Sequence, residues 1–428
     1  MEKDGTGVLS HKLLNDKCNC SHCGLCLVVC PTYRELLTET ASPRGRLALI
    51  NQAASGGLHI SSNLMEQMYQ CFGCMACDEI CPAGAEPSGL VLELRNVREK
   101  TNPAVWKKLL FNGLVRKPDI MELASSPFRI YERIGLRRLV GLARKVNLLP
   151  DRISDWEAML PNIPNRPLRQ ILPGAAEAKG ESHYRVGFFL GCMQSLFFGR
   201  GSAATVRVLT RNGCTVLTPK DIQCCGMPSV SYGRQDLAKE QARHNISVFE
   251  HANVETILTD CATCGSMLKS YADLLEDDQI WSERAATFSR NVYDISEFLM
   301  KIPLVKPQHR IERRVTYHDP CHLRRGQGVW KEPRSLLGLV DGVDLIELVE
   351  ADWCCGSGGS QLIGHYSLSR KVMQRKIDQL KNSGAEVIAS GCPACQMQLN
   401  AGIKRRGLQV KVIHPVELLD WAYHGMRY

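Results

Sequence analysis

The chain has 428 residues, of which 44% are hydrophobic and 23% are charged, as in ordinary globular proteins of two or three domains. No run of about 18 apolar residues occurs, and the first residues lack the apolar stretch of a signal peptide. We therefore expect a cytoplasmic protein without a transmembrane helix. Twenty cysteines in that compartment argue against structural disulfides and favour metal or redox chemistry.

The same cysteine spacing occurs twice near the N-terminus. Residues 20–31 read CSHCGLCLVVCP and residues 71–82 read CFGCMACDEICP, each with the pattern C-x2-C-x2-C-x3-C-P. In the two-cluster ferredoxin run, three thiolates bind one [4Fe–4S] cluster and the fourth binds the other. The spacing predicts two cubane clusters, one held by Cys20, Cys23, Cys26 and Cys81, the other by Cys71, Cys74, Cys77 and Cys30. Zinc, the alternative, usually takes two C-x-x-C pairs.

The formal charge of +9 treats every cysteine as neutral. A cubane cluster with four thiolates carries about −2, so several clusters would cancel most of this excess. We interpret the basic balance as compensation for buried anionic cofactors and expect no nucleic-acid partner. The two arginines of SPRGRLALINQA (42–53) are expected to begin a helix that covers the clusters.

Residues 84–160 have apolar side chains at three- and four-residue intervals, which predicts helices. The stretch 135–150 is amphipathic and basic, and we expect its apolar stripe to pack on the protein itself. The alternative is contact with a membrane surface or an acidic partner. Residues 160–183 concentrate proline and glycine and are interpreted as a linker.

A second repeat follows, with a different cysteine pattern. Its first copy contains Cys192, Cys224, Cys225, Cys261 and Cys264, and its second contains Cys321, Cys354, Cys355, Cys392 and Cys395. The offsets between copies are 321 − 192 = 129, 354 − 224 = 130 and 392 − 261 = 131. This agreement indicates a duplicated module.

Short β-rich runs end at these cysteines, and helical stretches follow, which predicts an α/β module with a mainly parallel sheet. Ligands of such folds bind beyond the carboxyl ends of the strands, so all five cysteines of one copy are able to converge. Five thiolates exceed the four that a cube needs. The residues alone therefore leave open an unusual polynuclear iron–sulfur site, a cluster with a redox thiol, or zinc.

The patterns C-x31-C-C-x35-C-x-x-C and C-x32-C-C-x36-C-x-x-C resemble the cysteine-rich CCG domain of heterodisulfide reductase. Joined to a two-cluster ferredoxin domain, they resemble the iron–sulfur subunit of glycolate oxidase, the lactate-utilisation iron–sulfur proteins and the catalytic iron–sulfur subunit of heterodisulfide reductase. SPRGRLALI favours the first two. The resemblance implies that complete CCG motifs bind noncubane [4Fe–4S] clusters, so one or two are expected here, with the five cysteines of each copy as ligands.

The resemblance also implies a function. The chain would be an electron-transfer subunit that receives electrons from a flavoprotein partner oxidising a 2-hydroxy acid such as glycolate or lactate. It would pass them through the cubane clusters to the CCG clusters and a terminal acceptor. No G-x-G-x-x-G or Walker motif occurs in the chain, which fits a relay. The terminal acceptor would be a membrane cytochrome or a quinone. Such a partner would bring the chain to the inner face of the membrane.

The alternative is a heterodisulfide-reductase-like catalytic subunit that reduces a disulfide or quinone at a noncubane cluster, so the sequence leaves open whether the chain is itself an enzyme. Candidate catalytic residues are then Cys321, Cys354, Cys355, His318 and His322. The two histidines flank Cys321 and would either deliver protons or order the loop by hydrogen bonding.

The predicted fold class is α+β to α/β, with a helical ferredoxin-type domain followed by duplicated CCG modules. The predicted boundaries are 1–100 for the two-cluster domain, 101–183 for the helical segment and linker, 184–300 for the first CCG module and 301–428 for the second.

Overall fold

The computed structural model describes residues 17–145, 150–160, 163–359 and 361–425. The chain forms two units. Unit 1 comprises Met1–Phe111, Gly226–Ala238 and Trp353–Lys376, and unit 2 comprises Asn112–Cys225, Lys239–Asp352 and Ile377–Tyr428. Each unit is therefore built from segments that are far apart in the sequence.

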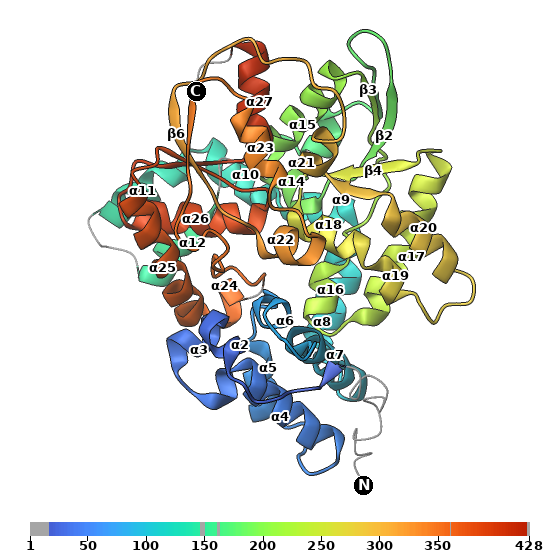
Figure 1. Cartoon of the computed structure of the whole chain (residues 1–428), viewed down its shortest axis with the longest axis vertical. Helices are drawn as coiled ribbons and strands as arrows, with labels where there is room; N and C mark the ends of the chain where they lie inside the picture. Colours follow the sequence, from blue (N-terminus) through green and yellow to red (C-terminus); the bar gives the residue numbers. More distant parts are fainter. Residues whose placement is uncertain (1–16, 146–149, 161–162, 360, 426–428) are drawn as a thin grey trace. The chain divides into compact units, whose positions relative to one another are not determined.

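Unit 1 is helical among its described residues (Figure 1). Its elements are α2 (Leu25–Val29), α3 (Pro31–Leu36), the 3-10 helix η2 (Glu39–Ala41), α4 (Pro43–Ala54), α5 (Ser62–Tyr69), α6 (Ala76–Glu79), α7 (Pro87–Thr101), α8 (Val105–Leu110), α16 (Met227–Ser231), α24 (Gln361–Gly364) and the first parts of α17 (Gln235–His251) and α25 (Tyr366–Ser383).

The core of unit 1 lies between α4, α5 and α7. These helices bury the apolar residues Leu47, Ile50, Leu64, Met65, Met68, Leu90, Val91, Leu94 and Val97. Ser42 begins α4, because its hydroxyl accepts a hydrogen bond from the Gly45 amide at 2.9 Å and Pro43 occupies the first turn. The predicted helix with Arg44 and Arg46 is confirmed as α4.

The α16 segment also packs on α7 in unit 1. Gly233 ends it with a φ of +81°, and a Cβ atom there would lie 2.3 Å from the carbonyl oxygen of Arg95. Only glycine combines this conformation with so close an approach of two backbones.

Unit 2 contains two sheets (Figure 1). The first has the order β1-β3-β2-β4-β5, with strands β1 (Ala175–Ala176), β2 (Tyr184–Phe188), β3 (Cys214–Leu217), β4 (Thr256–Thr259) and β5 (Val292–Asp294). The second has the order β7-β6-β8-β9, with strands β6 (Arg313–Tyr317), β7 (Val343–Ile346), β8 (Val387–Ala389) and β9 (Lys411–Ile413).

All pairs in these sheets are parallel except the short antiparallel pair β1–β3. The order β3-β2-β4-β5 of the first sheet corresponds to β7-β6-β8-β9 of the second. The predicted fold class, a helical ferredoxin-type domain with duplicated α/β modules, is confirmed.

The helices of unit 2 connect and cover these strands. They are α9 (Pro118–Ala124), α10 (Ser126–Arg133), α11 (Leu136–Lys145), α12 (Asp151–Met159), α13 (Leu168–Ile171), α14 (Cys192–Leu196), α15 (Gly199–Arg211), α18 (Ala262–Lys269), α19 (Tyr271–Leu274), α20 (Ser282–Arg290), α21 (Ile295–Leu299), α22 (Cys321–Gln327), α23 (Glu332–Gly338), α26 (Pro393–Arg405) and α27 (Pro415–His424). A π-helical turn, η3 (Phe111–Val115), precedes α9.

The two CCG modules contact each other reciprocally within unit 2. Helix α15 of the first packs on α27 of the second, and α23, the counterpart of α15, packs on α21, the counterpart of α27. The buried carboxylate of Asp420 in α27 accepts a hydrogen bond from Nη2 of Arg207 in α15 at 2.6 Å. The parts of the two modules that belong to unit 2 are therefore packed against each other.

The predicted helices of residues 84–160 are confirmed over the described part. The expected inward packing of the 135–150 stripe is wrong for its leucines, while residues 146–149 lie outside the described residues. In α11 the side chains of Leu136, Leu139 and Leu142 are 40%, 63% and 61% exposed.

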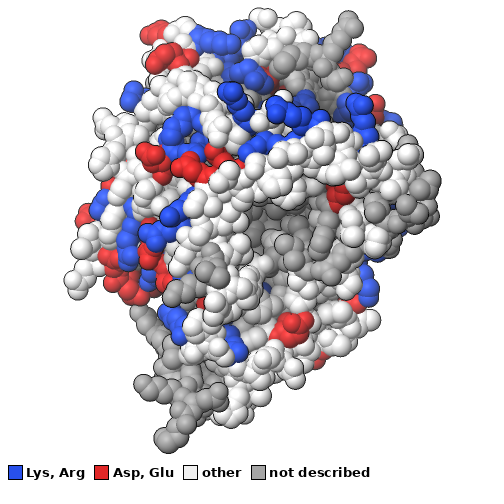
Figure 2. Space-filling model, turned by 180° about the vertical axis from the view of Figure 1, so that it is seen from behind, with Lys and Arg blue, Asp and Glu red and all other residues white. Residues whose placement is uncertain are grey.

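No helix among the described residues is long and apolar enough to cross a membrane. On the face shown in Figure 2, Lys and Arg lie in several groups beside Asp and Glu, with broad uncharged areas between them.

Candidate iron-sulfur sites

One hollow in unit 1 is lined by Cys30, Cys71, Cys74 and Cys77. Cys30 comes from the end of α2, whereas the other three come from the turn between α5 and α6 and from α6 itself. The fourth cysteine of the first run thus lies beside the first three cysteines of the second run. The structure brings together the four residues that were predicted to share one cluster.

A second hollow in unit 1 is lined by Cys20, Cys23, Cys26 and Cys81. Cys77 lines this hollow as well as the first, so the two lie side by side. The assignment of these eight cysteines as cluster ligands stays a prediction. The remaining nearby cysteine, Cys18, donates instead to the Asn51 side chain, with Sγ 2.9 Å from Oδ1.

Left-handed turns shape both runs. Gly24 (φ 84°) precedes α2 and Met75 (φ 59°) precedes α6, at equivalent positions of the C-x-x-C-x-x-C pattern. The backbone therefore bends around the hollow before each short helix begins. The non-glycine residue Met75 is unusual in this conformation, which costs roughly 1–3 kcal/mol and often occurs at functional sites.

Arg46 lines the hollow of Cys30 and is almost fully buried. Its Nε donates to Gln67 O at 3.0 Å, and its Nη1 donates to Thr32 Oγ1 at 3.0 Å. Its Nη2 is buried without a hydrogen-bond partner among the described residues. A buried guanidinium nitrogen without an acceptor is costly, and an anionic group in the hollow would satisfy it.

Two thiols of this hollow, those of Cys30 and Cys77, have raised pKa values. Burial raises the pKa of Cys30, and the charge of Arg46 partly offsets this rise. Burial, the charge of Asp78 and the neighbouring thiols together raise the pKa of Cys77 well above its ordinary value. Such crowded thiols become thiolates when a cation binds, because a metal provides the positive charge that stabilises them.

Arg44 lines the other hollow. Its Nη1 donates to His22 O at 3.3 Å, and its Nε donates to Glu39 Oε1 at 2.7 Å. Arg44 and Arg46 are therefore divided between the two hollows. Both arginines of the predicted helix thus line cysteine hollows, although the sequence did not indicate this division.

The cysteines of the first CCG module follow the carboxyl ends of three adjacent strands. Cys192 begins α14 after β2, Cys224 and Cys225 follow β3, and Cys261 precedes α18 after β4. A hydrogen bond to Cys224 and burial raise the pKa of Cys192 well above its ordinary value. Hydrogen bonds to Cys225 and Cys261, together with burial, likewise raise the pKa of Cys264. The structure brings all five predicted residues together.

Surrounding groups order this site. Asn245 Nδ2 lies 3.3 Å from Cys224 O and donates to it, while the Tyr271 hydroxyl donates to Cys225 O at 2.8 Å. A Cβ atom on Gly191 would lie 3.1 Å from the Cys264 sulfur. The twin-cysteine loop is thus held by buried side chains. Cys214, with no counterpart in the second module, lies in β3, where burial raises its pKa to about 12.

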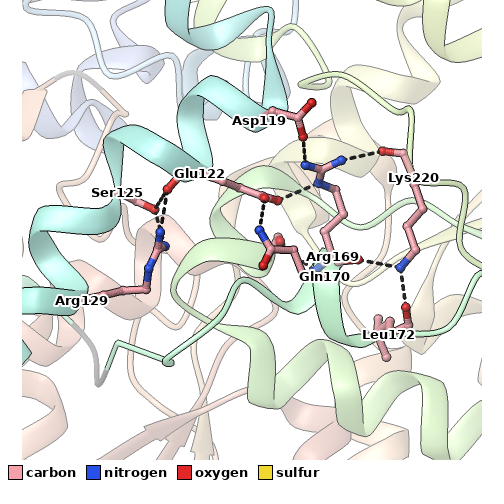
Figure 3. Close-up of polar contacts among 9 residues, drawn as sticks. Asp119, Glu122, Ser125, Arg129, Arg169, Gln170, Leu172 and Lys220 are labelled. Carbon is pink, nitrogen blue, oxygen red and sulfur yellow. Dashed lines mark hydrogen bonds and ion pairs between the residues drawn. The ribbon is translucent and has the colours of Figure 1, made fainter. Parts of the chain in front are cut away.

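A hollow beside Cys192 and Cys224 is also lined by Glu122 and Arg169. Figure 3 shows the polar contacts of these two side chains. Arg169 Nε donates to Glu122 Oε1 at 2.6 Å, its Nη2 donates to Asp119, and its backbone amide donates to Ser195 in α14 at 3.1 Å. Helix α9 is thereby fastened to the helix that begins with Cys192. Arg169 was not predicted from the sequence, because it lies in the proline-rich stretch 160–183 that was interpreted as a linker.

The cysteines of the second CCG module follow the equivalent strands. Cys321 begins α22 after β6, and Cys392 precedes α26, which contains Cys395. These three belong to unit 2, whereas Cys354 and Cys355 follow β7 and belong to unit 1. Within unit 1, the Gly356 amide donates to the Cys354 sulfur at 3.4 Å.

The two modules meet at their cysteine loops in unit 2. Thr263 Oγ1 lies 3.4 Å from the Cys392 sulfur, and the Ala262 amide donates to Gly391 O at 2.8 Å. Hydrogen bonds from Cys395 and Thr263 lower the pKa of Cys392 to about 6, although burial opposes them. Burial and the Cys392 charge raise the pKa of Cys321 to about 11.

The candidate histidines differ in their surroundings. His318 is buried, and its backbone amide donates to Ala389 O at 3.0 Å. His322 Nδ1 lies 3.3 Å from the Cys321 sulfur, and burial lowers the His322 pKa. This contact accommodates either predicted role, ordering of the loop or proton delivery.

Three family models match successive parts of the chain. A 4Fe-4S dicluster domain matches residues 18–85, the linker region of the glycolate oxidase iron-sulfur subunit matches 102–160, and a cysteine-rich domain matches 186–269 and 315–400. Together with the thiols and the unpartnered guanidinium nitrogen, these matches indicate iron–sulfur clusters.

The chain is similar over nearly its whole length to a probable glycolate oxidase iron-sulfur subunit of Bacillus subtilis, with 34% identity covering 94% of this chain and 93% of the relative. One subunit of the fumarate reductase (CoM/CoB) of Methanothermobacter marburgensis is 29% identical over 94% of this chain and 72% of its own length. Lactate utilization protein A of Halalkalibacterium halodurans is 32% identical over 55% of this chain and 96% of its own. The chain belongs to the family of glycolate oxidase iron–sulfur subunits.

Proposed function

We propose that this chain is the electron-transfer subunit of a flavin-dependent 2-hydroxy acid oxidase or dehydrogenase complex. It would relay electrons from a flavoprotein partner, through two cubane clusters and one or two noncubane CCG clusters, to a terminal acceptor. Glycolate and lactate are the substrates suggested by the names of its relatives. When bound, the clusters supply the capacity to accept and release single electrons.

The observation that carries this proposal is the pair of adjacent hollows in unit 1. The first is lined by four cysteines and the second by five, because Cys77 lines both, as does Pro87. The cysteines Cys20, Cys23, Cys26 and Cys81 would hold one cubane cluster, and Cys30, Cys71, Cys74 and Cys77 the other. Two clusters in hollows that share a wall would lie close enough to pass electrons from one to the other.

Positively charged side chains of the protein would stabilise the reduced state of the clusters in these hollows. Arg46 places a buried positive charge beside Cys30, and Arg44 places a partly exposed charge beside Cys26. Since reduction adds negative charge, nearby cations favour the reduced state. The chain thus provides both the ligands and the counter-charge that a relay requires.

A second candidate function is reduction of a disulfide or quinone at a CCG cluster. Two observations favour it: both CCG motifs are complete, and a hollow lies beside Cys192 and Cys224. In this case the candidate catalytic residues would be those of the second CCG module: Cys321, Cys354, Cys355, His318 and His322. The chain would then be an enzyme subunit in its own right.

Substitution of one cysteine in each region separates these roles. Cys77→Ser is expected to remove one cubane signal from the electron paramagnetic resonance spectrum and to block electron transfer from the flavoprotein. Cys355→Ser is expected to leave both cubane signals in place and to abolish transfer to the terminal acceptor. Cys18→Ser is the matched control, since Cys18 lies outside both patterns, and it should keep every cluster signal.

Turnover is measured with the purified complex, a 2-hydroxy acid and an acceptor that reacts only beyond the CCG clusters. If Cys77→Ser and Cys355→Ser both retain full turnover, the relay is refuted. If Cys355→Ser loses reduction of a disulfide supplied with a chemical reductant, the second candidate function gains instead.

A further inference from the structure

Helices α10 and α11 form a basic amphipathic pair that follows α9. Residues 126–145 read SPFRIYERIGLRRLVGLARK, with six basic residues against the single acidic residue Glu132. The turn between the helices contains Gly135, whose φ is +73°. The pair therefore carries a strong positive excess on a short segment.

The apolar side chains of this pair face outward. Ile130, Ile134, Leu136, Leu139 and Leu142 are 57%, 66%, 40%, 63% and 61% exposed. Single exposed aliphatic side chains are common on protein surfaces. A contiguous group of them on consecutive helical turns is unusual and usually marks an interaction site.

The inward face of α11 explains this orientation. Arg137 has a side chain only 16% exposed, and it forms ion pairs with Glu132 at 2.8 Å and with Glu157 of α12 at 3.2 Å. These contacts turn the opposite side of α11, with Leu139 and Leu142, away from the rest of unit 2. The leucines are thus held outward by ion pairs behind them.

The basic residues outside those pairs lie among the exposed apolar ones. Arg133 and Arg138 are exposed, and Glu132, the acidic residue of the segment, is already paired with Arg137. On the preceding helix α9, which contacts α10, Leu123 is 71% exposed. The surface therefore combines aliphatic side chains with positive charges that have long, flexible stems.

We propose that α10 and α11 bind the surface of a bilayer containing anionic lipids. Leu139 and Leu142 would enter the boundary between headgroups and acyl chains, while Arg133 and Arg138 would reach the headgroup phosphates. Charge complementarity selects this occupant, because the segment is strongly basic and its apolar residues are aliphatic. The proposal does not depend on the proposed function, since it rests on residues outside the cysteine sites.

The test is co-sedimentation of the full-length, cluster-containing protein with vesicles. Vesicles of equal parts phosphatidylcholine and phosphatidylglycerol should bind the protein at low salt and release it at high salt, whereas pure phosphatidylcholine vesicles should bind it weakly. The variant Leu139→Glu/Leu142→Glu should bind the anionic vesicles about tenfold less tightly or worse.

Removal of each charge by Arg133→Gln or Arg138→Gln should weaken binding about fivefold. Ile280→Glu is the matched control, because Ile280 is 73% exposed on a different part of unit 2. This control should bind as the unaltered protein does, and the visible spectrum should verify that every variant retains its clusters.

The proposal is overturned if the unaltered protein does not sediment with anionic vesicles at low salt. It is also overturned if the Leu139→Glu/Leu142→Glu variant binds them as tightly as the control does. Loss of self-association or of a protein partner in that variant, without vesicle binding by the unaltered chain, would assign the surface to a protein.

Discussion

Two arginines that are two positions apart in α4 lie beside different cysteine hollows. Arg46 is almost fully buried beside Cys30, whereas the Arg44 side chain is 29% exposed and paired with Glu39. A buried charge is screened less by water and ions than an exposed one. The two hollows are therefore electrostatically unequal, although their cysteine patterns are identical.

Substitution of Arg46 should change the potential of one cubane cluster. Arg46→Gln removes a buried positive charge, so the cluster proposed at Cys30, Cys71, Cys74 and Cys77 should become harder to reduce. We expect its midpoint potential to fall by about 60 mV or more, which is a tenfold change for a one-electron couple. A redox titration followed by electron paramagnetic resonance measures both clusters together.

Arg44→Gln is the matched control for this experiment. It should shift the other cluster, and by less, because Arg44 is partly exposed and already paired with Glu39. Equal small shifts of both clusters in both variants would contradict the assignment of one arginine to each hollow.

At the scale of elements, we expect the folding of α2 to depend on cluster binding more than on packing. This five-residue helix (Leu25–Val29) has no buried residue, and Leu25 and Val28 are 46% and 61% exposed. A helix this short is unstable by itself in water. The cysteines on either side of α2, when bound to a cluster, would fix its ends.

Removal of iron should therefore unfold α2 selectively. After chelation of the iron, hydrogen exchange of the α2 amides should approach the rate of an unfolded peptide. Exchange in the central strand β4 (Thr256–Thr259) should change much less, because its residues lie in the sheet core. Unchanged protection of α2 after iron loss would show that packing holds this helix.

His414 connects an element of the second module to a cysteine loop of the first. Its Nε2 lies 3.0 Å from Asp260 O, next to Cys261, and its Nδ1 lies 3.3 Å from the Val416 amide that begins α27. A neutral ring with the proton on Nε2 satisfies both contacts. Burial lowers the His414 pKa to about 4.

The stability contributed by His414 should depend on pH. The unfolded chain binds this proton below pH 6.5 and the folded chain only below about 4, so the contribution is complete above 6.5 and is lost as the pH falls to 4. The loss should be about 2 kcal/mol between pH 7 and pH 5. Hydrogen exchange of the α27 amides at the two pH values measures it.

His414→Asn should remove most of that pH dependence, because asparagine retains an acceptor for the helix start but does not titrate. The exposed His251→Asn should leave it unchanged. The protection of α27 could fall equally between pH 7 and pH 5 in the unaltered chain and in His414→Asn. In that case, groups other than His414 would cause the pH dependence.

At the scale of the whole molecule, the sequence predicted what spacing determines. The duplicated module was evident because Cys192 and Cys321 begin copies that stay in register, and the sheet orders confirm it. The gathering of Cys30 with the second run followed from the length of one short helix. These features depend on residue spacing and local backbone geometry, both of which are determined by the order of residues.

Other features depend on tertiary contacts and had no local signal. The periodicity of α11 shows which side chains share a face, but the ion pairs of Arg137 decide that Leu139 faces outward. Arg169 lies in a stretch whose composition is typical of a linker, yet Glu122 binds it beside Cys192. The inclusion of Trp353–Lys376 in unit 1 likewise follows from packing alone.

The proposed relay is best tested by anaerobic purification of this chain from its own cells, with co-purifying proteins identified by mass spectrometry. Glycolate or lactate is then added while the cluster absorbance is followed. We expect a co-purifying flavoprotein of the hydroxy-acid oxidase type and prompt bleaching of the clusters by one of these acids. The opposite result would be a complex that lacks a flavoprotein and whose clusters are reduced by neither acid. If a disulfide then oxidises these clusters after they have been reduced chemically, the relay is contradicted.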